Sequence, residues 1–574
     1  MDLVLIGLPG SGKTAVGRRM AARHDARFID LDATIEATTG QTIRHLFDEF
    51  GEAGFRSLER AAVADLGRAD SAPGLRRVIA TGGGTIMDPV NRWSLYRNRR
   101  VAWLDAPPEV LAQRLRNSPH PRPLLQGRDP VGAIRDLATK RERFYAPGLR
   151  LNGLSQVGAV LERLDTFLAE PEAPGTTLLA AATRLGQVRI GAGIALAALL
   201  ETPAVRDAGR AIIVSEPVAW SAVGQHLAEG LTAAGIQVER ILLPTGEPAK
   251  RLAVIEAAGG DLARLRAERS EPLIAIGGGA LGDAAGFLAA TWLRGVPLVH
   301  VPTTLVAQVD SSIGGKAAVD LAEGKNLVGA FHQPIAIVID VELLAGLPER
   351  QRRAALGEAA KMAAIGDEAL FELLERDGPA IARGDPAAIA HGALAELVER
   401  CAWAKIEVVL ADERENGAAG SAAAGSTAPG RLALNLGHSL GHGFEAAAGY
   451  GDALVHGEAV AYGLRAACRI GVELGLTPVA RAERIERLLT SLELAPAGGL
   501  DRLGLELSAV LAALATDKKH ASGRLRWVLP TTASVEIRSD VPDEVVARIA
   551  AQLRAPTDAA GPAGQVAQIG VTDR

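Results

Sequence analysis

The stretch LVLIGLPGSGKTAVGRR, residues 3–19, decides the fold of the first part of the chain. Its apolar start predicts a buried strand, and GLPGSGKT (7–14) fits the pattern G-x-x-x-x-G-K-[ST], in which a glycine-rich loop leads into a helix. Backbone N–H groups of such a loop surround phosphate oxygens, while Lys13 reaches the β and γ phosphates and Thr14 ligates magnesium. The alternative is a glycine-rich turn with an accidental lysine, but the strand-loop-helix context favours a nucleoside triphosphate site.

Short apolar segments alternate with amphipathic helical segments in two parts of the chain, which predicts parallel sheets with helices on both faces. From about residue 343 onwards, alanine, leucine and arginine recur with helical spacing. The predicted organisation is an α/β domain at 1–168, a linker at 169–177, a second α/β domain at 178–342, an all-helical domain at 343–555 and a disordered tail at 556–574.

Composition excludes several classes of protein. The 574 residues carry a net charge of −5, which gives no general attraction to nucleic acid or to an anionic membrane surface. We find no uninterrupted apolar stretch of about 18 residues, so we predict no membrane span. The start of the chain does not resemble a secretory signal. Cys401 and Cys468 are the only cysteines, so we expect reduced thiols in a cytoplasmic protein.

Polar residues follow the first glycine-rich loop in a series of short segments. FIDLD places Asp30 and Asp32 at the end of a predicted strand and on the same face, because side chains two apart in a strand point the same way. The further segments GFRSLE, ATGGGT, RPLL and RERFYA supply Arg56 and Glu59, Gly82 to Gly84, Arg122, and Arg141. Taken singly, such aspartates are often cap residues and such arginines are often solvated. In this order, the set resembles shikimate kinase over about residues 1–165.

The resemblance to shikimate kinase implies a P-loop kinase fold with a nucleoside-monophosphate-kinase-like parallel sheet, which phosphorylates shikimate with ATP and Mg²⁺. It also implies that Asp32 orients the attacking hydroxyl, that two arginines grip the carboxylate of shikimate, and that Arg122 lies in a lid over ATP. The implied shikimate-binding residues are Asp32, Arg56, Gly82, Gly83 and Arg141. The implied ATP-binding residues are Gly10, Ser11, Gly12, Lys13, Thr14 and Arg122, with Thr14 and Asp30 at the magnesium.

A second glycine-rich turn, IAIGGGALGDAAGF (274–287), follows a predicted strand. By itself it is a weak sign of dinucleotide binding, because glycine-rich turns are common. It is accompanied by the segments TGEPAK (245–250), PTT (302–304), DSSIGGKAAVDLAEGKN (310–326), GEAAK (357–361), DERE (412–415), NLGHSLGH (435–442), HGEAV (456–460) and DKKH (517–520). In this order, the series resembles 3-dehydroquinate synthase over about residues 178–540.

This second resemblance implies a Rossmann-like NAD-binding domain followed by an all-helical domain of the dehydroquinate synthase type. It implies cyclisation of 3-deoxy-D-arabino-heptulosonate 7-phosphate to 3-dehydroquinate, with release of phosphate. The implied NAD-binding residues are Glu247, Lys250, Gly278, Gly279, Gly282, Asp283, Thr303, Thr304, Lys316 and Lys325. The implied contacts of the heptulosonate phosphate are Asp310, Lys316, Asn326, Lys361, Lys405, Arg431, Asn435, His442, Lys518 and Lys519.

There are two interpretations of which histidines ligate the metal. HSLGH places His438 and His442 four residues apart, so on a helix both imidazoles face the same side and both could ligate zinc. The resemblance implies instead that Glu358, His438 and His456 hold Zn²⁺ or Co²⁺, with His442 beside the metal as a proton-handling residue. Three protein ligands leave positions open for substrate oxygens, as a catalytic metal requires.

Lysine usage supports both resemblances. The chain has nine lysines against fifty-three arginines, and eight of the nine lie in or beside these motifs. A compact ammonium group with three donors cannot be replaced by a broad guanidinium. We therefore expect the lysines to mark anion-binding and catalytic positions. The predicted catalytic residues are Lys13 and Asp32 in the kinase part, and Lys316, Lys361, Lys405 and His442 in the synthase part.

Residues 416–430, NGAAGSAAAGSTAPG, separate two motifs that lie close together in the family, so we expect an exposed and mobile loop there. The predicted protein is thus bifunctional, with small-molecule substrates, no nucleic-acid or membrane partner, and a homodimer formed through the synthase half. Two alternatives stay open: the second half is another sugar-phosphate cyclase or a polyol dehydrogenase, or one half is a non-catalytic module.

Overall fold

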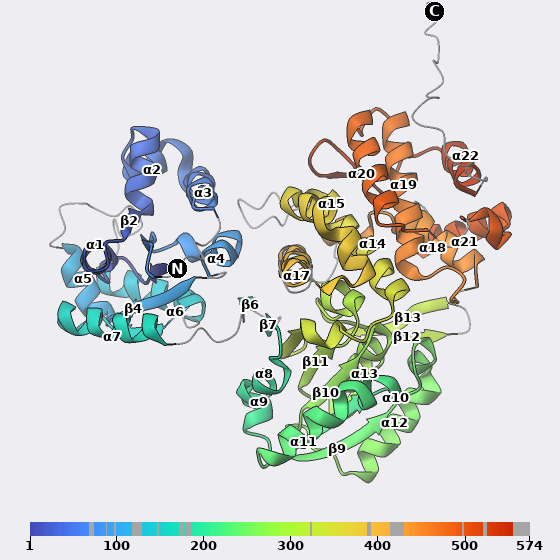
Figure 1. The fold of residues 1–574 in the computed structure, drawn as a ribbon, viewed down its shortest axis with the longest axis horizontal. Coiled ribbons are helices and arrows are strands. Elements are labelled where there is room, and N and C mark those ends of the chain that lie inside the picture. Colours follow the sequence, from blue (N-terminus) through green and yellow to red (C-terminus); the bar gives the residue numbers. More distant parts are fainter. Residues whose placement is uncertain are drawn as a thin grey trace, which may run out of the picture. The chain divides into compact units, whose positions relative to one another are not determined.

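The structure, a computed structural model (Figure 1), describes residues 1–67, 74–87, 89–96, 99–116, 129–145, 149–170, 177–179, 186–321, 324–386, 392–413, 430–449, 451–495, 499–520 and 525–554. The chain divides into two compact units, Met1–Leu347 with Ile389–Arg431, and Pro348–Ala388 with Leu432–Arg574. Among the described residues, no helix is both long enough and apolar enough to cross a membrane.

The first α/β part is a five-stranded parallel sheet in the order β2-β3-β1-β4-β5. Its strands are β1 (Asp2–Ile6), β2 (Arg27–Asp30), β3 (Arg77–Ala80), β4 (Arg100–Asp105) and β5 (Leu149–Asn152). Its helices are α1 (Lys13–Arg23), α2 (Leu31–Thr39), α3 (Ile43–Ala64), α4 (Pro89–Tyr96), α5 (Pro108–Arg116), α6 (Pro130–Tyr145) and α7 (Val157–Ala169). The central strand β1 is apolar without alternation because both of its faces are covered. Val4 and Ile6 enter one core, whereas Leu3 and Leu5 enter the other.

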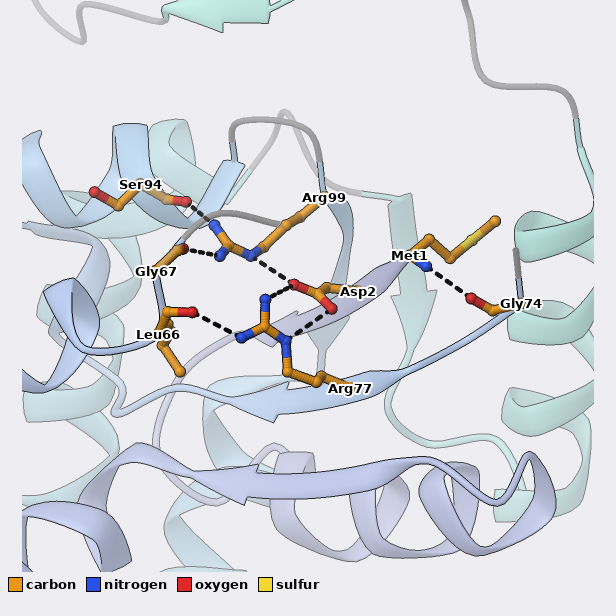
Figure 2. Close-up of polar contacts among 8 residues, drawn as sticks. All are labelled: Met1, Asp2, Leu66, Gly67, Gly74, Arg77, Ser94 and Arg99. Carbon is orange, nitrogen blue, oxygen red and sulfur yellow. Dashed lines mark hydrogen bonds and ion pairs between the residues drawn. The ribbon is translucent and has the colours of Figure 1, made fainter. Parts of the chain in front are cut away.

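A buried ionic network joins the amino-terminal end of this sheet to two helices (Figure 2). Asp2 is 0% exposed, and both of its carboxylate oxygens accept from Arg77, at 3.0 and 2.6 Å, while Arg99 donates to it at 3.1 Å. The remaining N–H groups of the two arginines reach backbone carbonyls that include those of Leu66 and Gly67, just after α3. The network therefore fixes the end of α3 against β1 and β3, at the amino-terminal ends of the strands, whereas the phosphate loop follows the carboxyl end of β1.

The second α/β part has a seven-stranded sheet in the order β6-β7-β14-β11-β10-β8-β9, and only β6 is antiparallel to its neighbour. Its strands are β6 (Thr177–Leu179), β7 (Gln187–Gly191), β8 (Arg210–Ser215), β9 (Gln237–Leu242), β10 (Leu273–Gly277), β11 (Leu298–Pro302) and β14 (Ala336–Asp340). From β8 the chain adds β9 on one side of the sheet, and from β10 it adds β11 and β14 on the other side, so the direction reverses between β8 and β10. Ligands of doubly wound sheets bind at such a switch point, beyond the carboxyl ends of the strands. The turn after β10 is the second glycine-rich motif.

Helices cover both faces of this sheet, and a hairpin follows β11. The helices are α8 (Ala195–Glu201), α9 (Pro203–Arg206), α10 (Pro217–Ala219), α11 (Gln225–Ala233), α12 (Leu252–Arg264) and α13 (Gly279–Thr291). The hairpin pairs β12 (Lys316–Leu321) with β13 (Gly324–Phe331). Helix α17 (Ala393–Ala411) clusters with this unit although it lies far along the sequence. The domain limits predicted from sequence placed these residues in the helical domain at 343–555.

The second unit is mostly helical. It contains α14 (Glu349–Gly366), α15 (Glu368–Arg383), α18 (His438–Ala447), α19 (His456–Glu473), α20 (Val479–Ser491), α21 (Leu507–His520) and α22 (Asp543–Arg554). A helical carboxyl-terminal region is thus confirmed, and it also contains a short antiparallel hairpin of β15 (Trp527–Pro530) and β16 (Val535–Arg538).

Close backbone approach between three of these helices depends on glycine. A Cβ atom at Gly457 would lie 1.7 Å from the carbonyl oxygen of Ala354, and one at Gly463 would lie 1.6 Å from that of Gly437. The first clash is between α19 and α14, and the second is between α19 and the start of α18. Since Gly357, Gly437 and Gly457 each adjoin a predicted metal ligand, the glycines let these ligands come together.

Candidate active sites

The phosphate loop of the first part has the predicted conformation. Gly7, Gly10 and Gly12 have φ angles of 143°, 82° and 99°, which only glycine adopts easily, and α1 begins directly after Gly12. Lys13 is buried and its Nζ donates to the carbonyls of Gly7 at 2.8 Å and Leu8 at 3.1 Å. The loop therefore brings together the predicted ATP-binding residues Gly10, Ser11, Gly12, Lys13 and Thr14.

Asp30 and Asp32 correct one step of the sequence argument. We expected both on one face of a strand, but β2 ends at Asp30, and Asp32 lies in the first turn of α2. Asp30 is the N-cap of α2, since its Oδ1 accepts from the backbone N–H of Ala33 at 3.3 Å. Thr14 Oγ1 donates to Asp30 Oδ2 at 2.8 Å, so the two predicted magnesium residues meet.

The predicted shikimate-binding residues gather around the turn at Gly82–Gly84. A Cβ at Gly82 would lie 2.7 Å from Asp32 Oδ1, and one at Gly84 would lie 2.5 Å from an Arg56 Nη atom. Arg141 on α6 donates to the carbonyl of Gly83 at 2.7 Å. The structure thus brings these five residues together. Arg122, the predicted lid residue, lies outside the described residues.

Glu59 and Tyr145 complete this cluster, and the sequence argument gave neither a role. Glu59 is 1% exposed, and burial raises its pKa, although the ion pair with Arg56 at 2.7 Å and the hydrogen bond from Thr85 oppose that rise. The Tyr145 hydroxyl donates to the Gly83 carbonyl at 2.7 Å, and burial raises the pKa of Tyr145 to about 12. Tyr145 follows Arg141 by four residues on the same helical face, which is the signal that could have identified it.

The glycine-rich turn after β10 carries the predicted NAD-binding set. Helix α13 begins at Gly279, and a Cβ there would lie 2.7 Å from Ser311 Oγ, whereas one at Gly278 would lie 3.2 Å from Thr304. Thr303 follows β11, and its N–H donates to the carbonyl of Gly277 at 3.0 Å. Gly278, Gly279 and Gly282 line a small cavity. Because these glycines lack side chains, no side chain of theirs covers the backbone where a pyrophosphate would approach.

An ionic cluster adjoins this turn. Lys250 is 3% exposed, and its Nζ lies 2.9 Å from Asp283, 3.7 Å from Glu247 and within hydrogen-bonding distance of Asn326. Lys325 contacts Glu247 at 3.3 Å. Burial raises the pKa of Asp283 to about 6, against the opposing charge of Lys250. The cluster unites four predicted NAD residues with Asn326, which we had expected to contact the sugar acid.

Two further predicted anion-binding residues are held by protein groups. Lys405 on α17 lies 2.6 Å from Asp310, and both belong to the set predicted for the heptulosonate phosphate. Arg431 is 2% exposed and donates to the carbonyls of Glu413 at 2.7 Å and Gly314 at 3.1 Å. Arg431 therefore supports the turn before Lys316, and its contact with substrate stays a prediction. The side chains of Lys518 and Lys519, and the predicted loop at 416–430 apart from Gly430, lie outside the described residues.

In the helical unit, Glu358, His438 and His456 meet. Glu358 Oε1 lies 3.1 Å from His456 Nε2 and 3.5 Å from His438 Nε2, and one donor atom of each residue lies within 4.8 Å of the others. His442 stands beside them, with its ring centre 5.1 Å from that of His438. Of the two interpretations left open by spacing, the set with His456 places three ligands together, and His442 sits at its edge.

Charge in this cluster suits a cation. Glu358 is 1% exposed, and Lys361, His438 and His456 hold its pKa well below the usual range despite burial. Burial, together with Lys361, lowers the pKa of His438 to about 3, so its imidazole is neutral. Hydrogen bonds with Glu358 and Glu445 overcome burial and raise the pKa of His456 to about 10. His456 is therefore protonated while no cation is bound, and a metal must displace its Nε2 proton. One carboxylate oxygen and the two imidazole nitrogens then form a donor set that fits a divalent metal such as zinc.

Comparisons with known proteins agree with both halves. Family models for "3-dehydroquinate synthase N-terminal", "3-dehydroquinate synthase C-terminal" and "Shikimate kinase" match residues 240–354, 355–520 and 9–148. The 3-dehydroquinate synthase of a Synechococcus strain (ATCC 27144) is 41% identical over 341 residues, covering 59% of this chain and 87% of that protein. The enzyme of Rhodospirillum rubrum is 41% identical over 347 residues, covering 59% and 82%.

A solved structure extends the likeness to the fold. The 2-epi-5-epi-valiolone synthase of Streptomyces hygroscopicus, determined with NAD⁺ and Zn²⁺ bound, is 26% identical with a TM-score of 0.55, and the match covers 64% of this chain and 96% of that one. Identity to the 3-dehydroquinate synthases is higher than to this other cyclase. The chain therefore belongs to the 3-dehydroquinate synthase family and carries a shikimate kinase domain before the synthase part.

Proposed function

We propose that this chain is a bifunctional enzyme of the shikimate pathway. Its first part is a shikimate kinase, which transfers phosphate from ATP to shikimate with Mg²⁺. Its second part is a 3-dehydroquinate synthase, which converts 3-deoxy-D-arabino-heptulosonate 7-phosphate to 3-dehydroquinate and phosphate with NAD⁺ and Zn²⁺ or Co²⁺. The observation that carries the second assignment is the meeting of Glu358, His438 and His456 in a chain 41% identical to 3-dehydroquinate synthases.

In the kinase part, the proposed roles follow from position. Lys13 and the loop N–H groups bind the phosphates of ATP, while Thr14 and Asp30 hold the magnesium shell. Arg56 and Arg141 bind the carboxylate of shikimate, because a guanidinium fork matches a carboxylate. Asp32 orients the hydroxyl that attacks. Glu59 holds Arg56 in place through the 2.7 Å ion pair.

In the synthase part, the donor set of Glu358, His438 and His456 suits the metal. When bound, the ion polarises oxygens of the substrate, and NAD⁺ takes up and returns a hydride. Lys361, which is paired with Glu358, supplies positive charge beside that site. His442, whose ring centre lies 5.1 Å from that of His438, is the proposed proton-handling residue.

Lys405 and Lys316 are the proposed cationic contacts of the anionic sugar in the first unit. Asp310 presets the Lys405 ammonium at 2.6 Å, so this lysine loses little freedom when an anion arrives. Glu247, Lys250, Asp283 and Lys325 contact the dinucleotide, with Gly278, Gly279, Gly282, Thr303 and Thr304 at its phosphates.

Two assays on the full chain test the two activities, and a variant that removes one activity serves as the control for the other. Lys13→Ala should abolish ADP formation from ATP and shikimate but leave phosphate release from the heptulosonate phosphate unchanged. His438→Ala should do the reverse. A synthase releases phosphate without net NADH, so NADH accumulation from a polyol would support a dehydrogenase instead. Turnover only of a sugar phosphate without a carboxylate would support another cyclase.

Assembly and location are finer proposals. We infer a homodimer through the synthase half, which light scattering coupled to gel filtration would test, since a monomeric mass would refute it. We also infer a cytoplasmic enzyme, because both reactions draw on the ATP and NAD⁺ of metabolism. Cell fractionation that recovers the chain elsewhere would refute that.

A further inference from the structure

The imidazole of His456 is bracketed by two carboxylates. Its Nε2 lies 3.1 Å from Glu358 Oε1, and its Nδ1 lies 3.1 Å from Glu445 Oε2. Glu445 is 8% exposed and sits on α18, seven residues after His438. Seven residues are two helical turns, so α18 presents His438 and Glu445 on one face. One helix thus supplies a metal ligand and the outer contact of a second ligand.

The two contacts fix which nitrogen of His456 does what. Glu358 is itself one of the three ligands, so Nε2 is the nitrogen on the side of the metal. With a metal on Nε2, Nδ1 carries the hydrogen, and Glu445 accepts it. A carboxylate in this place fixes the ring orientation and makes the other nitrogen a stronger donor to the metal.

The other imidazole ligand has a different outer partner. His438 Nδ1 lies 3.2 Å from the carbonyl oxygen of Leu436, which is a neutral backbone group. The site therefore contains one imidazole oriented by the backbone and one oriented by a charged side chain. Of the two outer partners, only the Glu445 side chain can be removed by substitution. Substituting Glu445 is therefore a specific test of the arrangement.

We propose that Glu445 is a positioning residue that holds His456 in the Nδ1–H tautomer and so sets the affinity for a single divalent ion. This rests on the metal site of the proposed function. A rival arrangement exists, because His442, Glu445 and His456 also offer ligand atoms within 4.8 Å of one another. That arrangement would use Nδ1 as a ligand, and the chain would bind a second ion.

Metal binding to the full-length apoprotein tests the proposal without reference to catalysis. The dissociation constant and stoichiometry for Zn²⁺ are measured by competition with a chromophoric chelator, and the visible spectrum is recorded with Co²⁺. Glu445→Ala should raise the dissociation constant about 10- to 100-fold. Glu445→Gln keeps an acceptor without the charge, so it should give a smaller rise and a shifted Co²⁺ band. The stoichiometry should stay at one ion per chain.

Glu486→Gln is the matched control, because this carboxylate in the same unit binds Arg465 at 2.9 Å and touches no metal ligand. It should leave the constant and the spectrum unchanged. Equal constants and spectra for wild type, Glu445→Ala and Glu445→Gln would overturn the proposal. Two ions in wild type and one in Glu445→Ala would overturn it in favour of the rival. Phosphate release by wild type is scored separately, so a failed function is distinguishable from a failed positioning role.

Discussion

Two buried carboxylates, Asp2 in the kinase sheet and Glu358 in the helical unit, differ in what surrounds them. Their exposed fractions are 0% and 1%, so burial does not separate them. Asp2 faces Arg77 and Arg99, and those guanidiniums are in turn bound by backbone carbonyls (Figure 2). Glu358 also faces one cation, Lys361, but its two other partners are imidazoles. A guanidinium has no lone pair for a cation, whereas an imidazole has one. The chemistry of the neighbouring side chains therefore indicates that Glu358 belongs to a metal site and that Asp2 has a structural role.

The largest effect should come from Glu358→Gln. Removing the anionic ligand should lower the rate of phosphate release by about 1,000-fold, equivalent to about 4 kcal/mol of transition-state stabilisation. Shikimate phosphorylation by the same preparation should not change. The control is Glu473→Gln, which alters an exposed ion pair between Glu473 on α19 and Arg548 on α22. Phosphate release within tenfold of wild type would place Glu358 with Asp2 as a structural group.

Asp2→Asn should instead act on stability. It leaves the buried Arg99 and the partly buried Arg77 short of their counter-charge, so the kinase part should lose about 3 kcal/mol of unfolding free energy. Kinase activity measured against urea should fall at a lower concentration, while synthase activity should keep its midpoint. The control is Asp165→Asn, which alters partly exposed contacts with Arg23 and His24. If both variants had the same midpoint, the network would carry no stability.

Gly457→Ala should disturb the site without touching a ligand. The added methyl group meets the Ala354 carbonyl, so α14 and α19 must separate, at a cost of about 1–3 kcal/mol. Both the thermal midpoint of the helical unit and its affinity for Zn²⁺ should fall. Gly451→Ala in the same unit meets nothing within 4 Å and should change neither. Normal zinc affinity in Gly457→Ala would mean that the close helix contact does not position the ligands.

His300 offers a smaller, pH-dependent test of a buried group that is kept neutral. Burial, with a contribution from His332, lowers its pKa from 6.5 to about 4. The unfolded state therefore takes up a proton first as pH falls below 6.5, and stability declines between 6.5 and 4. From pH 7 to 5.5 this loss should be about 1 kcal/mol. His300→Gln should flatten the dependence and the exposed His226→Gln should not, as read from urea midpoints against pH. Equal slopes would exclude His300.

The sequence was most informative where local pattern fixes geometry. The phosphate loop, the turn after β10 and the three proposed metal ligands all lie in motifs whose order implied the families. It misplaced Asp32, because a strand and the first turn of a helix both suit FIDLD. It missed Tyr145, whose partner Gly83 lies 62 residues earlier, and Glu445, whose contact with His456 depends on how two neighbouring helices pack. It also placed α17 with the helical domain, because helical spacing does not reveal which core a helix joins.

The central claim is that one anionic and two imidazole side chains hold the metal of a cyclising enzyme. Its most direct test is phosphate release from 3-deoxy-D-arabino-heptulosonate 7-phosphate by chelator-treated full-length protein, titrated with Zn²⁺ in the presence of NAD⁺. The account predicts that release recovers fully at one ion per chain, with one 3-dehydroquinate formed per phosphate and no net NADH. Release that is independent of metal, or NADH that accumulates with turnover, would contradict it.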